Sequence, residues 1–109
     1  MDSNSRIEHL LKILQEEPDD SFSLYALALE YSNLDEQKAL FYFEKLLTEQ
    51  EDYVPAYYHA AKLYAELDER ERANEIYKKG LEISQKMSDL HASNELEKAY
   101  KQFLQEEDF

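Results

Sequence analysis

Histidines and carboxylates are the side chains of this sequence that could carry out chemistry, but their spacing does not support it. His9, His59 and His91 stand far apart, and no His-x-x-x-His or Glu-x-x-His pair occurs. A zinc site on a helix needs ligands at such spacings. The single glycine and the absence of cysteine also exclude a glycine-rich phosphate loop, a nucleophile elbow and a thiolate site. We therefore expect no metal, no cofactor and no enzymatic activity.

Acidic residues dominate the charge of the chain. Asp and Glu number 25 against 12 Lys and Arg, which gives a formal net charge of -13. A field of this sign repels a phosphate backbone, so the charge excludes nucleic acid as a partner. Two interpretations of the charge remain open: it keeps a small domain in solution, or the partner is basic.

Length and composition predict one all-α domain over residues 1–109. The chain is rich in helix formers and has one glycine and two prolines, which leaves little room for hairpins. No apolar run approaches the roughly 20 residues of a membrane span. No basic segment followed by an apolar core marks a signal peptide. Because the absence of cysteine also fits a reducing compartment, we expect a cytoplasmic protein that does not contact the membrane.

Two stretches of the chain carry the same apolar pattern about 34 residues apart. The shared positions are Leu24, Leu27, Ala28, Tyr31, Ala39, Phe43 and Leu46 in the first stretch and Tyr57, Ala60, Ala61, Tyr64, Ala73, Tyr77 and Gly80 in the second. Each stretch predicts two amphipathic helices joined by a short turn, with small residues where the helix backbones approach closely. Such a unit is too short to bury its own apolar face, so it must stack on a neighbour. Stacking produces a concave surface suited to holding another polypeptide.

Apolar spacing and helix-start residues divide the chain into six expected helices. They cover residues 5–16, 21–33, 36–49, about 53–66, 69–86 and 90–106. The expected caps are a Ser5–Glu8 capping box, Asp19 or Asp20, Asp35, Asp52, and Asp68 with Glu71. Gly80 lies inside the fifth helix, where glycine costs up to about 1 kcal/mol relative to alanine. We therefore expect a neighbouring helix to press on that position.

The two stretches resemble tetratricopeptide repeats. In that family the first helix of a repeat carries a large residue, Leu-Gly or Leu-Ala, and Tyr, and the second carries Ala, an aromatic residue and a small residue. Leu46 and Glu51 depart from this pattern, which has a small residue and a proline at those places. The resemblance implies a short right-handed α-solenoid of antiparallel helix pairs. Its parts are an N-terminal half-repeat helix at 5–18, repeats at 21–53 and 54–87, and a C-terminal capping helix at 90–106.

The resemblance also implies a function, that of a non-catalytic protein-interaction module holding a partner peptide or helix in the concave groove. The groove positions that it implies hold Phe22, Tyr25, Leu29 and Asn33 in the first repeat and Pro55, Tyr58, Lys62 and Glu66 in the second. His59, beside Tyr58, is counted with the groove residues, and Tyr53 lies nearby. The apolar spacing independently puts Tyr25, Leu29 and Tyr58 off the small-residue stripes of their helices. Aromatic rings with hydroxyl groups suit contact with a peptide. The sequence leaves open whether the C-terminal helix caps the stack or fills the groove.

Two other functions remain open. The chain could associate with itself as a homodimer through the ends of the stack, with Ile7, Leu11 and Leu14 or Leu96, Tyr100 and Phe103 as the contact residues. Alternatively, the tyrosine-rich cleft beside His59 could hold a small molecule.

Overall fold

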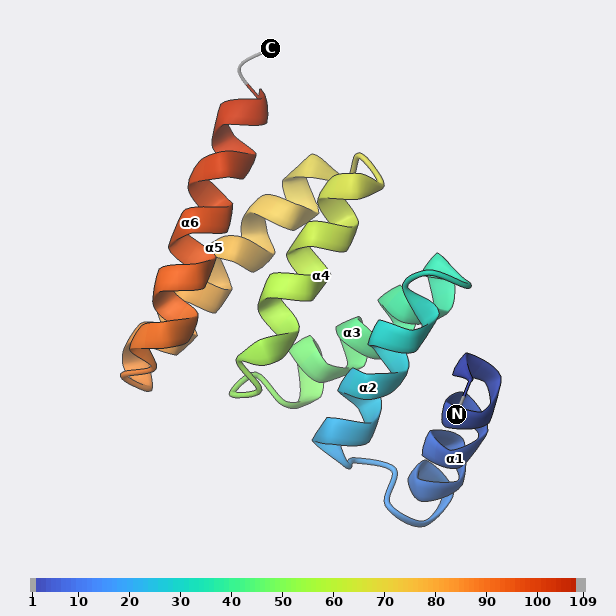
Figure 1. The fold of residues 1–109 in the computed structure, drawn as a ribbon. Coiled ribbons are helices and arrows are strands. Elements are labelled where there is room, and N and C mark those ends of the chain that lie inside the picture. The colour runs from blue at the N-terminus through green and yellow to red at the C-terminus, as the bar shows by residue number, and fades with distance from the viewer. Residues whose placement is uncertain (1, 108–109) are drawn as a thin grey trace. The chain divides into compact units, whose positions relative to one another are not determined.

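The computed structural model describes residues 2–107, which form six α-helices and no strand. The helices are α1 (Ser3–Glu16), α2 (Ser21–Tyr31), α3 (Glu36–Glu49), α4 (Pro55–Glu66), α5 (Arg70–Lys86) and α6 (Leu90–Glu107), as Figure 1 shows. The predicted all-α class is confirmed. The chain divides into two compact units between Tyr53 and Val54, which is also the predicted boundary between the two repeats. The assignment of the whole chain to one domain stays a prediction.

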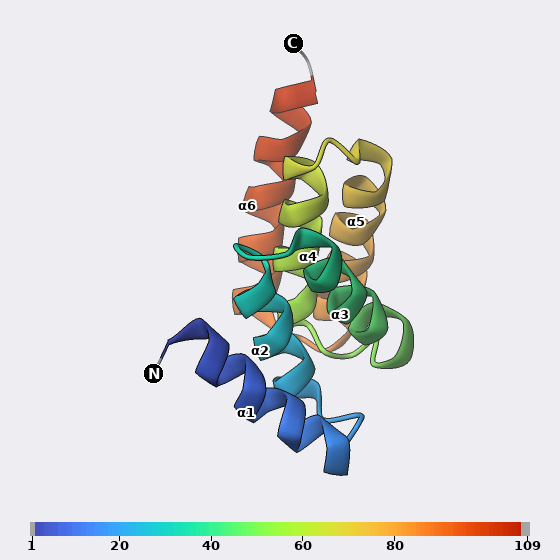
Figure 2. The same ribbon diagram turned by 90° about the vertical axis from the view of Figure 1, so that its right-hand side faces the viewer.

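The first unit is the α2–α3 hairpin with α1 packed against α2 (Figure 2). Its core includes a cluster of Ile7, Leu10 and Leu27, and the partly buried side chains against this cluster are Ile13, Leu14, Ala26, Tyr31 and Tyr42. Ala28 and Ala39 are fully buried, in agreement with the predicted close approach of the helix backbones. The half-repeat helix therefore covers the apolar face of the first hairpin.

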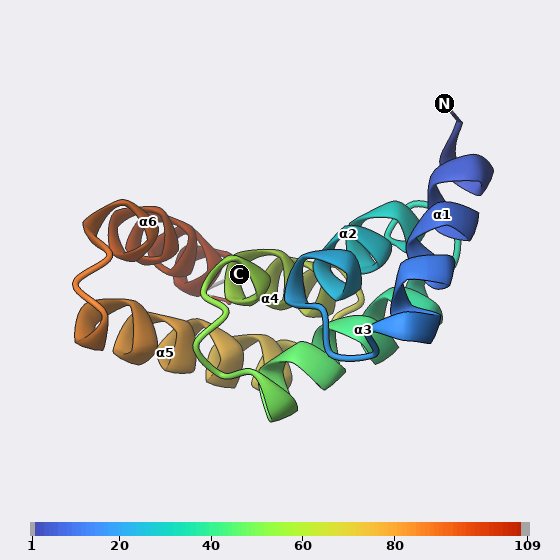
Figure 3. The same ribbon diagram turned by 90° about the horizontal axis from the view of Figure 1, so that it is seen from below.

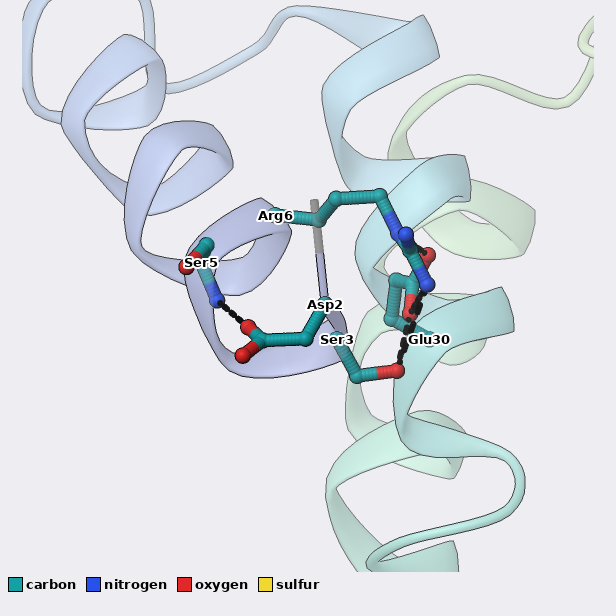
Figure 4. A network of polar contacts seen from close by, with 5 residues as sticks. All are labelled: Asp2, Ser3, Ser5, Arg6 and Glu30. Carbon is teal, nitrogen blue, oxygen red and sulfur yellow. Dashed lines mark hydrogen bonds and ion pairs between the residues drawn. The ribbon is translucent and has the colours of Figure 1, made fainter.

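A polar network fixes the start of α1 to the end of α2 (Figure 4). Arg6 forms an ion pair with Glu30, and the Ser3 hydroxyl donates to the Glu30 carboxylate at 2.9 Å. These two partners hold the pKa of Glu30 below its ordinary value, because both stabilise the ionised carboxylate. The network orients α1 on α2 in addition to the apolar contacts.

Two of the predicted helix caps are confirmed and one is wrong in the first unit. Asp20 and Asp35 accept from the backbone amides of Ser23 and Lys38, as the sequence predicts. The Ser5–Glu8 box does not start α1, because the helix begins a turn earlier and Asp2 accepts from the Ser5 amide at 2.8 Å (Figure 4). The Asp2 carboxylate therefore takes the N-cap role, one turn before the position where the Ser5 hydroxyl was expected to take it.

The second unit contains two further corrections to the predicted caps. Asp52 does not cap α4, which follows Val54 without a side-chain cap and has Pro55 in its first turn, where a missing amide costs nothing. Asp68 does not cap α5 either, because its backbone is left-handed (φ 65°) and closes the end of α4. Ser88 (φ 56°) closes α5 in the same way. Around each turn the following amide donates five residues back, from Glu69 to Tyr64 and from Asp89 to Ser84.

In the second unit, α4 and α6 lie on the same side of α5 and both contact it (Figure 3). The predicted pressure on Gly80 is confirmed: a Cβ atom there would lie 2.7 Å from Tyr57 Cβ and 3.2 Å from Leu96 Cδ1. The Ser93 hydroxyl donates to the Ser84 hydroxyl at 2.8 Å, and the Tyr100 hydroxyl donates to Asn74 at 2.7 Å. These bonds fix the position of α6 on α5. No helix within residues 2–107 combines the length and apolar character needed to span a bilayer.

Candidate functional site

A pocket of about 260 Å³ opens between α4, α5 and α6 of the second unit. Its lining residues are Tyr58, Lys62, Ala65 and Glu66 from α4, Tyr77 from α5, and Ala99, Gln102, Phe103 and Glu106 from α6. Each residue of the α4 and α6 sets has another member of its set three or four positions away, so each helix turns one face to the pocket. The α6 helix therefore forms one wall of the pocket and leaves it open.

Aromatic side chains form much of the pocket wall. The Tyr77 ring lies 5.4 Å from the Phe103 ring and 5.6 Å from the Tyr100 ring. Tyr77 and Phe103 are almost fully buried, with 4% and 3% of their surface exposed, whereas Tyr58 is half-buried. The buried rings have fixed positions, and the half-buried Tyr58 is accessible to a ligand.

Charged groups surround these rings. Burial raises the pKa of Tyr77 to about 12, and Tyr58 and the carboxylates of Glu106 and Glu66 contribute in the same direction. The Arg70 guanidinium opposes this shift; it lies 3.9 Å from the centre of the Phe103 ring. Arg70 also donates to the Phe103 carbonyl at 2.8 Å, which ties the C-terminal half of α6 to the start of α5. The Tyr77 hydroxyl therefore stays protonated at neutral pH and can donate and accept hydrogen bonds.

Three of the four site residues predicted in the second repeat line this pocket together. Tyr58, Lys62 and Glu66 share one face of α4, while His59 lies beside that face and is not part of the pocket lining. The His59 ring contacts the Tyr58 ring edge-on, with centroids 5.2 Å apart. Burial, followed by the charge of Lys62, lowers the pKa of His59. His59 thus supports Tyr58 and does not contribute its imidazole to the pocket.

The four site residues predicted in the first repeat follow one side of α2 and the turn after it. Phe22 is 66% exposed, Tyr25 and Leu29 are half-buried, and Asn33 lies exposed beyond the end of the helix. The Tyr25 ring lies 5.5 Å from the Tyr53 ring. This face presents aromatic area, and its role in binding stays a prediction.

The contribution of α6 to the pocket was left open by the sequence. The resemblance implies a capping helix at 90–106, and Ala99, Gln102, Phe103 and Glu106 recur at helical spacing within it. That spacing shows that these residues share a face of one helix. The pocket becomes visible only when the packing of this helix beside α4 and α5 is known. Tyr77 was assigned to the repeat core, and it is both a core residue and part of the lining.

The other functions considered from sequence find less support in the geometry. Ile7, Leu96 and Phe103, three of the residues considered for self-association, are buried within their own units, whereas Leu11 is exposed. The pocket is smaller than the roughly 300–1,000 Å³ of typical small-molecule sites, and His59 does not line it. Within residues 2–107 no three His, Asp or Glu side chains come together as a metal site.

Comparison with solved structures identifies similar helical repeat proteins. A tetratricopeptide repeat domain protein from Salinibacter ruber, solved by NMR, shares 37% identity over 79% of this chain and 88% of that chain, with a TM-score of 0.74. A crystal structure of a tetratricopeptide repeat domain protein from Salinibacter ruber shares 36% identity over 78% of this chain and 96% of that chain, with a TM-score of 0.73. The crystal structure of MamA is 23% identical over 97% of this chain and 69% of that chain, with a TM-score of 0.68, and supports the fold alone. No protein-family model and no curated protein matches the chain.

Proposed function

Because the chain belongs to the tetratricopeptide repeat family, we propose that it is a non-catalytic adaptor that binds a segment of a partner protein. The family is generally non-catalytic, and the similar structures support a protein-interaction role in general. The fold is a helical solenoid of repeats, a class of fold whose exposed helix faces commonly bind polypeptides.

The observation that carries this proposal is the open pocket beside α4. Three side chains predicted to bind the partner, Tyr58, Lys62 and Glu66, line it together, and α6 adds a second wall. A mixture of aromatic rings and polar ends fits a peptide, whose backbone and side chains need both kinds of contact. The exposed face of α2 with Phe22 adds a second contact surface in the first unit.

The charge distribution supports a basic partner. Residues 1–53 carry thirteen acidic and four basic side chains, and no Lys or Arg occurs from Ile13 to Gln37. An acidic surface attracts a Lys- or Arg-rich segment over a distance and speeds its association. The same charge opposes self-association of the first unit, so we rank the homodimer below the adaptor. The cytoplasm remains the compartment that we propose.

Affinity capture followed by binding measurements tests the proposal. The full chain is used as bait, and each captured protein is produced separately and titrated against the wild type and a Tyr25→Ala/Tyr58→Ala variant. We expect the double substitution to weaken binding at least tenfold, because buried interface tyrosines often contribute more than 1 kcal/mol each. Phe41→Ala is the matched control, since Phe41 is 63% exposed on α3, outside the predicted binding faces.

Circular dichroism must show unchanged helical content in each variant. Equal binding by the double variant and the wild type would refute the predicted binding faces. Capture of nothing but a second copy, with a concentration-dependent increase in particle mass by light scattering, would favour the self-associating alternative.

A further inference from the structure

The pocket of the second unit is lined by a tyrosine whose hydroxyl has no hydrogen-bond partner among the described residues. Tyr77 is 4% exposed and lines the pocket. Its hydroxyl makes no hydrogen bond with the described residues, and among those residues every fully buried side-chain oxygen or nitrogen is paired. The Tyr77 hydroxyl is therefore not fully buried, and its side chain lines the pocket. A ligand that displaces water from this hydroxyl without forming a hydrogen bond in its place would bind more weakly.

Two carboxylates from opposite walls accompany this hydroxyl. Glu66 on α4 makes no ion pair or hydrogen bond with any described residue. Glu106 on α6 is 3.9 Å from the Arg70 guanidinium, at the outer limit of an ion pair. Both carboxylates act on the Tyr77 hydroxyl and raise its pKa, after the larger effects of burial and of Tyr58. Lys62 also lines the pocket, so two carboxylates stand against one lining cation, and the excess negative charge favours a cation and disfavours an acidic side chain.

The aromatic rings of the pocket already accept cations from the chain itself. Arg70 lies with its guanidinium 3.9 Å from the centre of the Phe103 ring, and the Lys62 ammonium lies 6.0 Å from the centre of the Tyr58 ring. Arg70 is not part of the pocket lining, and Lys62 is exposed on a flexible side chain. Arg70 therefore covers one face of the Phe103 ring, whereas the longer distance from Lys62 leaves the Tyr58 ring as the one that a ligand cation can approach.

We propose that this pocket binds one arginine side chain of the partner segment. The inference rests on the proposed function and names the residue that the site recognises. A planar guanidinium has five donors, so it can stack on a ring such as Tyr58 while it donates to acceptors, and the pocket lining supplies acceptors in Glu66, Glu106 and Tyr77. Lysine offers a compact charge without a stacking plane, and leucine offers no donor. The volume of about 260 Å³ suits one long side chain.

Short peptides that differ in one side chain test this assignment. The probes are acetyl-Ala-Arg-Ala-amide and its Lys, Leu and Glu counterparts, titrated into the isotope-labelled full chain and followed by NMR. We expect the arginine peptide to shift the signals of Tyr58, Tyr77 and Phe103 at the lowest concentration. Tyr77→Phe removes only the hydroxyl and should weaken arginine binding about three- to tenfold. Glu66→Gln should weaken it by a similar factor.

Glu97→Gln is the matched control, because it removes one exposed carboxylate of α6 outside the pocket lining. If Glu97→Gln and Glu66→Gln weaken binding of the arginine peptide equally, the effect is general charge attraction and the arginine assignment is overturned. Tighter binding of the leucine peptide at the same signals would also overturn it, while the proposed adaptor function would stand. If no probe shifts the pocket signals, the assignment fails, and the titrations of captured partners decide the adaptor function separately.

Discussion

Replacing Gly80 with alanine tests how closely the helices of the second unit approach one another. A methyl group at this position would lie 2.7 Å from Tyr57 Cβ, 3.0 Å from Tyr57 Cγ and 3.2 Å from Leu96 Cδ1. The Leu96 atom is the end of a flexible side chain and can move. The Tyr57 Cβ atom cannot, because it is attached to the α4 backbone and Tyr57 is 1% exposed. The substitution must therefore push α4 and α5 apart.

The expected loss of stability follows from two opposing effects. Alanine in a helix interior is favoured over glycine by about 1 kcal/mol. Overpacking a well-packed core costs about 1–3 kcal/mol, and a contact with backbone-linked atoms belongs to the upper part of that range. We therefore expect Gly80→Ala to lower the free energy of unfolding by about 1–2 kcal/mol, with a fall in Tm of roughly 5–10 °C.

Urea denaturation followed by far-UV circular dichroism measures this change. The near-UV signal of the tyrosines should be followed in parallel, since Tyr57 and Tyr77 both lie in the affected unit. Gln85→Ala, at an exposed position of the same helix, is the control and should change stability by less than about 0.5 kcal/mol. A Gly80→Ala variant more stable than the wild type would refute the reasoning, because helix propensity would then outweigh the contact.

Three further predictions concern the second unit. Ser84→Ala should cost about 1–2 kcal/mol, because it leaves the buried Ser93 hydroxyl without its acceptor. Ser93→Ala should cost less, since the Ser84 hydroxyl keeps its bond to a backbone carbonyl; a double-mutant cycle in urea that shows additive losses would contradict the pairing. Ser88→Gly should raise the free energy of unfolding by about 0.5–1 kcal/mol, because glycine adopts the left-handed conformation without strain; an unchanged Tm would count against this strain. The pKa of His59 is lowered from 6.5, so its contribution to stability is complete above pH 6.5 and is lost as the pH falls through the lowered value. His59→Gln should remove this part of the pH dependence in thermal unfolding between pH 7 and 5, with His9→Gln as the control for the substitution type, and an unchanged profile would refute the assignment.

The sequence alone determined the helices and the residues at their closest contacts. Apolar residues at helical spacing predicted six helices within a few residues of their observed bounds. The small residues Ala28, Ala39, Ala61 and Ala73 were expected between helices and are fully buried. Gly80 could be interpreted correctly because a glycine inside a helix is costly unless a neighbour requires it. These features are local, since periodicity and side-chain size act within a few residues.

The helix starts were harder to predict, because several acceptors compete at each one. Asp20 and Asp35 cap their helices as expected. At α1 the sequence predicts Ser5 as the N-cap, whereas the Asp2 carboxylate accepts the hydrogen bond from the Ser5 amide. Asp68 carries a residue type that caps helices and also tolerates left-handed backbone, and the turn after α4 uses the second property. The residue type alone does not show whether Asp68 caps a helix or adopts the left-handed conformation.

Only the tertiary structure decided what lies beside the predicted binding face of α4. Tyr58 and Tyr77 are 19 positions apart, and Phe103 lies a further 26 positions along the chain, yet all three line one pocket. The pairing of Arg6 with Glu30, 24 positions apart, is of the same kind. A helical pattern shows which side chains share a face, but the contacts between faces depend on how whole helices pack. The sequence therefore predicts which residues share each helix face of the pocket, but it does not predict that these faces meet.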